Sequence, residues 1–309
     1  MLREVASRGT IAAAAESLFM SPSAVSQQMA VLEREAGLPL LEREGRGVRL
    51  TAAGRKLVRN TERILAEIEH AEADLATASS GVVGQLRLSA FPTAARAILI
   101  PALVQLGHEH PNLSISTIDL EPEESLPALK NRDLDVVLTY EWDVLPSLED
   151  PGIEREELLI ERVSLALPET HPAALRGGPV AIADLVDEQW IVGRDSTSML
   201  DLVKAAANRA GFEPQTGIHT MDFGVILAAV GAGLGVALGP QLAFTEQHPG
   251  VAVREIADLN LNRSIWAAIR RGSGSTPGIA AALSALRVSA SALAERLPSL
   301  EQRPSTQPD

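Results

Sequence analysis

The sequence predicts an α/β protein built from a small basic N-terminal domain, one long helix and a larger two-lobe body. The first observation is charge: the chain carries −13 overall, yet residues 1–60 hold nine arginine and lysine residues against six glutamates. The second is that residues 52–78 contain no proline and only one glycine. The third is an alternation of strand-like and helix-like segments over residues 86–296, which predicts a mostly parallel sheet covered on both faces.

Composition bounds the class of protein. With 309 residues, 46% of them apolar, the chain can bury a sizeable core. No apolar run approaches the ~20 residues that cross a bilayer, and the N-terminus shows no signal-peptide pattern. We therefore expect a soluble protein that stays in the cytoplasm and binds no membrane. The lack of cysteine excludes disulfides, thiolate metal sites and cysteine nucleophiles.

Residues 10–36 predict two helices joined by a tight turn. Thr10 can cap the segment IAAAAESL, whose apolar residues recur at helical spacing. Phe19 and Met20 fill the turn, and Ser21 followed by Pro22 is a typical helix start. Helices joined so closely must cross steeply, which predicts a helix-turn-helix whose second helix enters the major groove of DNA.

The second helix presents an uncharged polar face in the stretch SPSAVSQQMAVLE. Serine hydroxyls and glutamine amides can donate to and accept from base edges, whereas phosphates would repel carboxylates there. The residues predicted to contact double-stranded DNA from this helix are Pro22, Ser23, Ser26 and Gln27.

The segment LLEREGRGVRLT predicts a hairpin, since two short apolar segments flank Gly45 and Gly47. Its Arg43, Arg46 and Arg49 are placed to bind phosphates or to enter a minor groove. The alternative is a solvated surface hairpin, and the adjacent helices are what favour a DNA-binding wing.

Thr51 is a further candidate N-cap, and it precedes a helix predicted over residues 52–78. Apolar and small residues recur in this helix at spacings of 4-3-4-3-4, the rhythm of a coiled-coil seam. We expect dimerisation through this seam, and packing against its own domain is the alternative. The residues predicted for the seam are Leu57, Ile64, Ile68 and Leu75.

The stretch GTIAAAAESLFMSPSAVSQQMAVLEREAGLPLLEREGRGVRLTAAG resembles the winged helix-turn-helix of LysR-type transcriptional regulators. The resemblance rests on AAAAESL, SAVSQQ, LEREAGLPLLER, VRLTAAG and the heptad helix together, and later segments follow the order of that family. It implies a sequence-specific DNA-binding transcriptional regulator that forms a homodimer or homotetramer, contacts RNA polymerase and is controlled by a small-molecule effector. No metal or other cofactor is implied.

The sequence departs from the family pattern at two places. Family members usually have several residues before the segment equivalent to LREVASRG, so we expect Met1 to fall inside the first helix. In the second helix, Pro22 and Ser23 stand where the family often has Gln-Pro, and Gln27 stands where it often has arginine. The operator preference of relatives therefore does not carry over.

The resemblance also implies a periplasmic-binding-protein-like effector domain, whose two lobes enclose a cleft with hinges near residues 162–165 and 265–268. We expect a winged helix-turn-helix over 1–51, a linker and dimerisation helix over 52–78, a short linker over 79–85, an effector domain over 86–296, and a polar, disordered tail over 297–309. Lobe I is expected over 86–162 and 268–296, and lobe II over 163–267.

In this family the effector lies between the lobes, against helix N-termini where free backbone N–H groups favour an anion. The segments SAFPTAAR and GRDSTSML are two such strand-to-helix transitions, with ordinary helix caps as the alternative. Four of the nine aromatic residues are predicted just past strand ends that open on the cleft. We expect a small organic anion with an apolar or aromatic body. The predicted ligand-binding residues are Phe91, Thr93, Thr139, Tyr140, Trp142, Ser196, Thr197, Ser198 and Phe223.

Three segments resemble other kinds of site. GAGLG follows a predicted helix and precedes a strand, the reverse of the dinucleotide-binding order, so we interpret it as a helix stop. His108 and His110 do not share a helix face, which disfavours metal binding. The adjacent pairs Glu123–Glu124 and Glu156–Glu157 are interpreted as solvated surface.

The function classes can be ordered from these features. No nucleophile motif is present, so the sequence does not predict an enzyme. A solute-binding protein of the same two-lobe fold is the alternative, but the chain shows a DNA-reading domain and no export signal. An enzyme with an accessory DNA-binding domain comes third.

Overall fold

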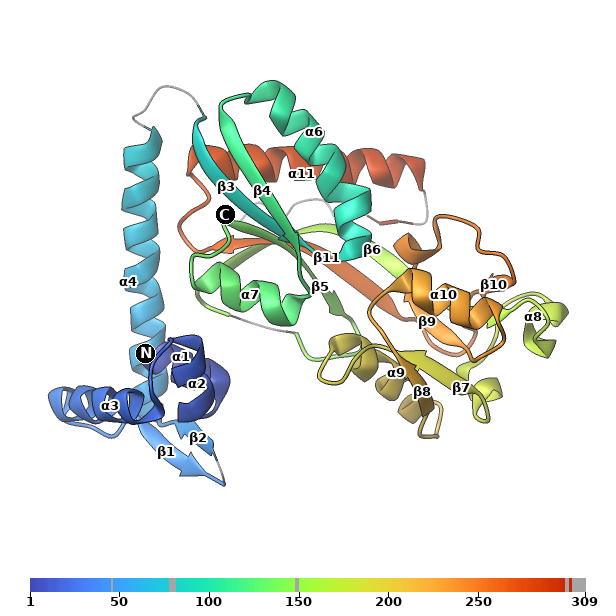
Figure 1. Ribbon diagram of the computed structural model, residues 1–309, viewed down its shortest axis with the longest axis horizontal. Helices are drawn as coiled ribbons and strands as arrows, with labels where there is room; N and C mark the ends of the chain where they lie inside the picture. The colour runs from blue at the N-terminus through green and yellow to red at the C-terminus, as the bar shows by residue number, and fades with distance from the viewer. Residues whose placement is uncertain (46, 78–81, 148–149, 298–299, 302–309) are drawn as a thin grey trace. The chain divides into compact units, whose positions relative to one another are not determined.

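We describe the protein from a computed structural model that covers residues 1–309 apart from 46, 78–81, 148–149, 298–299 and 302–309 (Figure 1). The chain divides into a first unit, Met1–Ala71, and a second unit, Glu72–Asp309. The long helix predicted from the sequence passes from the first unit into the second.

The first unit opens with α1 (Leu2–Arg8), α2 (Ile11–Ser17) and α3 (Pro22–Ala36). Both predicted caps are confirmed, because the Thr10 hydroxyl accepts the backbone N–H of Ala13 and the Ser21 hydroxyl accepts that of Ala24. Met1 is the N-cap residue of α1 rather than an internal helical residue. The three helices share a core whose buried residues are Leu2, Val5, Ala14, Ala15, Val25, Met29 and Leu40.

A hairpin and the long helix follow, as predicted. Strand β1 (Leu41–Glu44) pairs antiparallel with β2 (Gly47–Leu50). Gly45 supplies the positive φ of 57° that the turn requires. The helix α4 (Ala52–Thr77) begins at the predicted cap, where Gly54 donates its N–H to the Thr51 hydroxyl at 3.0 Å.

Lobe I of the second unit is a sheet in the order β6-β11-β5-β3-β4. Strand β3 is parallel to β4 and β5, whereas β11 is antiparallel to β5 and β6. Helix α11 packs on α6 and β3, and α7 packs on β5 (Figure 1). The elements are β3 (Gly84–Ala90), α5 (Pro92–Ala94), η1 (Ala95–Leu99), α6 (Ile100–Glu109), β4 (Leu113–Asp119), α7 (Pro122–Lys130), β5 (Val136–Trp142), the first part of β6 (Ile153–Pro168), β11 (Asn262–Arg270) and α11 (Pro277–Arg296).

The helical stretch formed by α5, η1 and α6 is π-helical in its middle segment, η1. Pro101 lies just after it and has no N–H to donate to the carbonyl four residues earlier. The missing donor accounts for the shift from α to π hydrogen bonding at this point.

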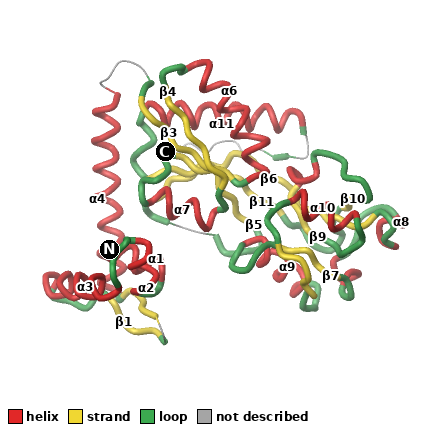
Figure 2. The backbone as a smooth tube through the Cα atoms, viewed as in Figure 1, coloured by secondary structure: helices red, strands yellow, loops and turns green. Residues whose placement is uncertain are grey.

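Lobe II holds antiparallel strands on β6 and a separate parallel pair, rather than the mostly parallel sheet predicted. Strands β9 and β10 pair antiparallel with the end of β6, and β7 is parallel to β8. Figure 2 shows the strands of the second unit continuing from lobe I into lobe II. The elements are α8 (Pro172–Arg176), η2 (Ile182–Leu185), β7 (Gln189–Val192), α9 (Ser198–Arg209), β8 (Gln215–His219), α10 (Phe223–Gly231), β9 (Ala237–Pro240), η3 (Gln241–Phe244) and β10 (Val251–Arg254).

The two lobes are joined by β6 and by the chain entering β11. Residues 153–162 of β6 pair with β11, and residues 163–168 pair with β9 or β10, so the first crossing is where we predicted it. The second crossing was predicted too late. Residues 263–269 of β11 pair with β5, which places the start of β11 in lobe I rather than in lobe II.

The C-terminal helix α11 ends at Arg296, where we predicted the end of lobe I. By length and composition it is the one described helix that could cross a membrane, but part of it is buried in the core of lobe I. The tail prediction is wrong at its start: Leu300 is buried, and Glu301 exchanges backbone hydrogen bonds of 2.8 and 2.9 Å with Ile160. Residues 298–299 and 302–309 lie outside the described residues.

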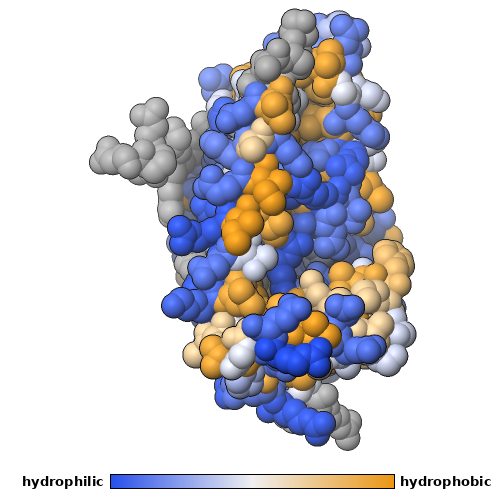
Figure 3. Space-filling model, turned by 90° about the vertical axis from the view of Figure 1, so that its left-hand side faces the viewer, coloured by the Kyte–Doolittle hydropathy of each residue, from blue (hydrophilic) through white to orange (hydrophobic). Residues whose placement is uncertain are grey.

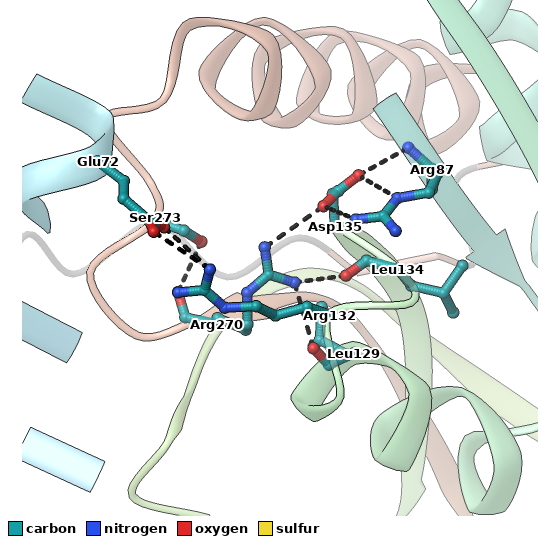
Figure 4. A network of polar contacts seen from close by, with 8 residues as sticks. All are labelled: Glu72, Arg87, Leu129, Arg132, Leu134, Asp135, Arg270 and Ser273. Atoms are coloured by element: carbon teal, nitrogen blue, oxygen red, sulfur yellow. Dashed lines mark hydrogen bonds and ion pairs between the residues drawn. The ribbon is translucent and has the colours of Figure 1, made fainter. Parts of the chain in front are cut away.

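A buried carboxylate organises one end of the lobe I sheet (Figure 4). Asp135 accepts two side-chain hydrogen bonds from Arg87, at 3.0 and 3.1 Å, and lies 3.3 Å from the Arg270 guanidinium. Burial opposes ionisation of this carboxyl, but the hydrogen bonds from Arg87 and the charge of Arg270 hold its pKa below the ordinary value.

Candidate DNA-binding and effector sites

Helix α3 separates an apolar face from a polar one. Val25 and Met29 are buried in the core of the first unit. The four residues predicted to contact DNA are all exposed on the same helix: Pro22, Ser23, Ser26 and Gln27. The start of the helix is therefore held by packing while its hydroxyls and amide remain open to a partner.

The hairpin carries two of the predicted arginines within the described residues. Arg43 is exposed. Arg49 is half-exposed and lies 3.0 Å from Glu42 and 3.7 Å from Glu44, so phosphate binding would compete with two carboxylates. Arg46 lies outside the described residues.

An apolar stripe runs along α4 between polar side chains (Figure 3). Three residues of the predicted seam are exposed: Ile64 is 62% exposed, Ile68 44% and Leu75 76%. The fourth, Leu57, packs against the core of the first unit. Leu57 thus anchors the helix to its own domain, and the other three residues stay available.

A cavity of about 540 Å³ lies between the lobes of the second unit. It adjoins a narrow recess of about 20 Å³, with which it shares Thr93, Glu121 and Phe223. A larger cavity, about 870 Å³, is lined by lobe II alone. We take the interlobe cavity as the candidate effector site, because a ligand held there contacts both lobes. Its lining residues are Pro92, Thr93, Arg96, Asp119, Leu120, Glu121, Glu124, Arg194, Met221, Asp222, Phe223 and Gly224.

Three of the predicted aromatic residues surround an arginine. The Arg263 guanidinium carbon lies 4.8 Å from the ring centre of Phe91, 5.1 Å from that of Tyr140 and 5.5 Å from that of Trp142. Such distances are those of cation–π contacts. The three rings are buried, and they form the inner wall of the recess rather than open contact surface.

The charge of Arg263 is balanced by Glu161. Both side chains are buried, with 2.6 Å between a guanidinium nitrogen and a carboxylate oxygen. Arg263 also donates to the Thr93 hydroxyl at 2.9 Å. The Thr93 hydroxyl therefore already accepts one hydrogen bond, and Thr93 also lines the cavity.

The N-terminus of α9 holds one of the protein's own carboxylates. The Ser198 N–H donates to Glu123 Oε1 of lobe I at 2.9 Å. The Thr197 hydroxyl donates to the carbonyl of Arg194 at 2.6 Å, and Ser196 is exposed with a φ of 64°. Glu123 is exposed, as interpreted, but it also links the two lobes through this hydrogen bond.

A hydroxyl joins Ser198 to the buried Glu121. Tyr140 donates its hydroxyl hydrogen to Glu121 Oε2 at 3.0 Å and accepts one from Ser198 at 3.4 Å. Burial raises the pKa of Glu121, and the hydrogen bond from Tyr140 opposes this shift. Burial, followed by the neighbouring Glu121, raises the pKa of Tyr140, so its hydroxyl stays protonated as a donor.

Only some of the predicted ligand-binding residues thus lie together in the structure. Phe91, Thr93, Tyr140, Trp142 and Phe223 line the recess. The placement of the rings past strand ends is confirmed for Phe91 and Phe223, which follow β3 and β8, but Tyr140 and Trp142 lie within β5.

The remaining predicted residues lie apart from the cavity lining. Thr139 is buried, and strand alternation turns it away from Tyr140. Ser196, Thr197 and Ser198 are not among the lining residues.

Sequence reasoning missed the charged residues of the site. Arg263 and Glu161 are 102 positions apart, and no local pattern connects them. Glu124 lines the cavity although it was interpreted as solvated surface. Glu156, interpreted in the same way, forms an ion pair with Arg287.

A helix-turn-helix unit joined to a two-lobe binding unit defines a class of ligand-responsive DNA-binding proteins, and comparison places the chain within it. Residues 1–55 match the bacterial regulatory helix-turn-helix proteins of the lysR family, and residues 79–290 match the LysR substrate binding domain. The chain belongs to the LysR family: it is a DNA-binding transcriptional regulator with an effector-binding domain.

Individual relatives agree with this assignment. The chain is 30% identical over 294 residues to a probable HTH-type transcriptional regulator, LrrA, of Synechococcus elongatus, covering 94% of this chain and 95% of LrrA. Full-length CbnR solved with its target DNA is 27% identical, with a TM-score of 0.54 and coverage of 94% and 97%. The fold of the effector binding domain of QuiR, solved with shikimate, matches 68% of this chain and 99% of that one at 18% identity and a TM-score of 0.58. These relatives are regulators, which sets aside the alternative of a plain solute-binding protein.

Proposed function

We propose that this regulator reads its operator with the exposed start of α3 and holds the flanking phosphates with Arg43, Arg46 and Arg49 of the hairpin. The observation that carries the proposal is the uncharged polar face of α3, which packing keeps exposed. Serine and glutamine on such a face match the donors and acceptors of base edges.

The hairpin proposal has its own test, a salt titration of operator binding. Arg43→Ala removes one phosphate contact, so it should weaken binding to all sequences alike and lower the salt slope by about one. Arg176→Ala, which removes an exposed arginine from lobe II, is the matched control. A slope identical to that of the parent would exclude Arg43 from the phosphate contacts.

We further propose that the protein acts as a homodimer or homotetramer joined by the exposed stripe of α4, as a two-fold DNA site requires. A regulator of this class works in the cytoplasm beside RNA polymerase, without a membrane and without catalysing a reaction.

The proposed effector is a small organic anion with an apolar or aromatic body, bound in the interlobe cavity. Glu123 supports the proposal of an acidic group on the effector, because the Glu123 carboxylate already accepts a hydrogen bond from the first backbone N–H of α9. An effector carboxylate would compete with Glu123 for this N–H group of lobe II. Thr93 would contact the effector from lobe I. Phe223, which is only partly buried, offers the ring surface.

A screen of aliphatic and aromatic carboxylates against melting temperature and tryptophan fluorescence tests the effector proposal. Thr93→Val should weaken binding of any hit. The control is Thr245→Val at the end of η3, which should not weaken binding because Thr245 does not line the cavity. Hits that are all uncharged sugars, or that bind Thr93→Val unchanged, would contradict it.

A further inference from the structure

The interlobe cavity is lined by more acid than base. Four carboxylates contribute to its wall, from Asp119, Glu121, Glu124 and Asp222, against the two guanidiniums of Arg96 and Arg194. A wall of this composition favours a ligand that carries a positive charge beside any negative one.

Glu121 differs from the other three carboxylates in its burial. It is 9% exposed, whereas Glu124 and Asp222 are exposed, and Asp222 caps α10 by accepting N–H groups of Gly224 and Val225. Among the described residues, no cation lies within ion-pair distance of Glu121, and its one hydrogen bond comes from Tyr140.

The positive charges that influence Glu121 either form an ion pair with another residue or act only at a distance. Arg263 lowers the pKa of Glu121 at a distance but forms its own ion pair with Glu161. Arg194 also acts at a distance and is exposed. A buried carboxylate of this kind is costly unless a cation reaches it.

The N-terminus of α9, which donates a hydrogen bond to a carboxylate, is linked to Glu121 through Tyr140. The hydroxyl of Tyr140 lies 3.0 Å from Glu121 Oε2 and 3.4 Å from the hydroxyl of Ser198, whose N–H binds the Glu123 carboxylate. The Ser198 N–H, which donates to a carboxylate, and the Glu121 carboxylate, which has no cationic partner among the described residues, are therefore linked through the hydroxyls of Tyr140 and Ser198. In an α-amino acid one carbon carries both charges.

From this arrangement we propose that the effector is an α-amino acid, whose ammonium group binds Glu121 in the cavity wall while its carboxylate displaces Glu123 from the Ser198 N–H, a group that lies outside the cavity lining while Glu123 occupies it. The inference rests on the proposed function of the interlobe cavity and narrows the ligand from an anion to a zwitterion. An ammonium donates charge-assisted hydrogen bonds to the Glu121 carboxylate, which is itself buried, and burial strengthens such bonds.

The experiment uses the full-length protein and matched ligand trios. Each common L-α-amino acid is tested by calorimetric titration beside the carboxylic acid that lacks its amino group and the amine that lacks its carboxyl group. We expect at least one amino acid to bind, with both partial analogues at least about tenfold weaker.

The isosteric variant Glu121→Gln removes the charge and leaves an oxygen to accept the Tyr140 hydrogen bond. It should lose about tenfold or more in affinity for the amino acid and little for the deaminated acid. Glu213→Gln, at an exposed position outside the cavity lining, is the control and should bind the amino acid like the parent. Because the ligand trios are measured on the parent protein, the proposal remains testable even if Glu121→Gln fails to fold.

Each negative outcome of the experiment rejects a different part of the proposal. Binding of deaminated acids as tightly as amino acids would overturn the zwitterion inference and leave the anionic effector standing. Binding of amines alone, or of no panel member, would overturn both. Amino-acid binding unchanged in folded Glu121→Gln would overturn the role of Glu121.

Discussion

The guanidinium of Arg263 and the carboxylate of Glu161 form a buried ion pair on neighbouring strands at the point where the two lobes join. Arg263 donates to Thr93 of lobe I, and Glu161 accepts the N–H of Leu242 from lobe II at 2.7 Å. The pair therefore fixes one group from each lobe, and both lobes depend on its integrity.

Breaking this pair should destabilise the second unit strongly. Arg263→Met leaves the Glu161 carboxylate buried without its partner, which should cost about 3–5 kcal/mol of unfolding free energy. The double change Glu161→Leu with Arg263→Met removes both charges and should recover most of that loss. Urea unfolding followed by tryptophan fluorescence measures both. A double variant no more stable than Arg263→Met would contradict the account.

The Asp135 carboxyl should make stability depend on pH in the acid range. Its folded pKa is lowered by Arg87 and Arg270, so its contribution is present above its unfolded pKa of about 3.9 and is lost as pH falls through the lower folded pKa. Asp135→Asn should therefore lower the melting temperature at pH 7 more than at pH 3. An equal loss at both pH values would show that the ionised form contributes nothing.

How much the sequence predicts depends on how local each determinant is. Thr10, Ser21 and Thr51 were predicted as caps, and each accepts a backbone N–H within three residues, so a short window contained the whole interaction. The first part of β6 carries no local apolar strand pattern, because its charged residues, such as Glu156, are neutralised by partners far along the chain. The same limit applies to the site, where Arg263 organises three rings that were predicted individually.

The exposed stripe of α4 leads to a prediction about assembly. Ile68→Lys places a charge where the seam would be buried, and an unpaired buried charge costs several kcal/mol, so the variant should shift towards monomer in light scattering. Glu67→Lys, at an exposed neighbour outside the 4-3-4 series, is the control and should assemble like the parent. Unchanged assembly of Ile68→Lys would place the dimer contact elsewhere.

Phe19 should limit the stability of the first unit. It is 98% exposed in the turn before α3 and has a φ of 53°, a left-handed conformation unfavourable for a bulky side chain. Phe19→Asn should stabilise the unit by about 1 kcal/mol, since asparagine tolerates this conformation and no buried surface is lost. Phe19→Ala, which keeps the strain, should gain less. Thermal unfolding compares the two, and equal melting temperatures would argue against strain at this position.

Sequence preference on DNA tests the central claim, that α3 reads the operator. The measurement is selection of bound sequences from a random DNA pool by the parent, by Gln27→Ala and by Gln105→Ala, the same change in the second unit. Gln27 is exposed on α3 and suited to a base edge, so its loss should relax preference at one position in each half-site, while Gln105→Ala should select the parent's sequences. Identical preferences for the parent and Gln27→Ala would contradict the assignment of Gln27 as a base-reading residue.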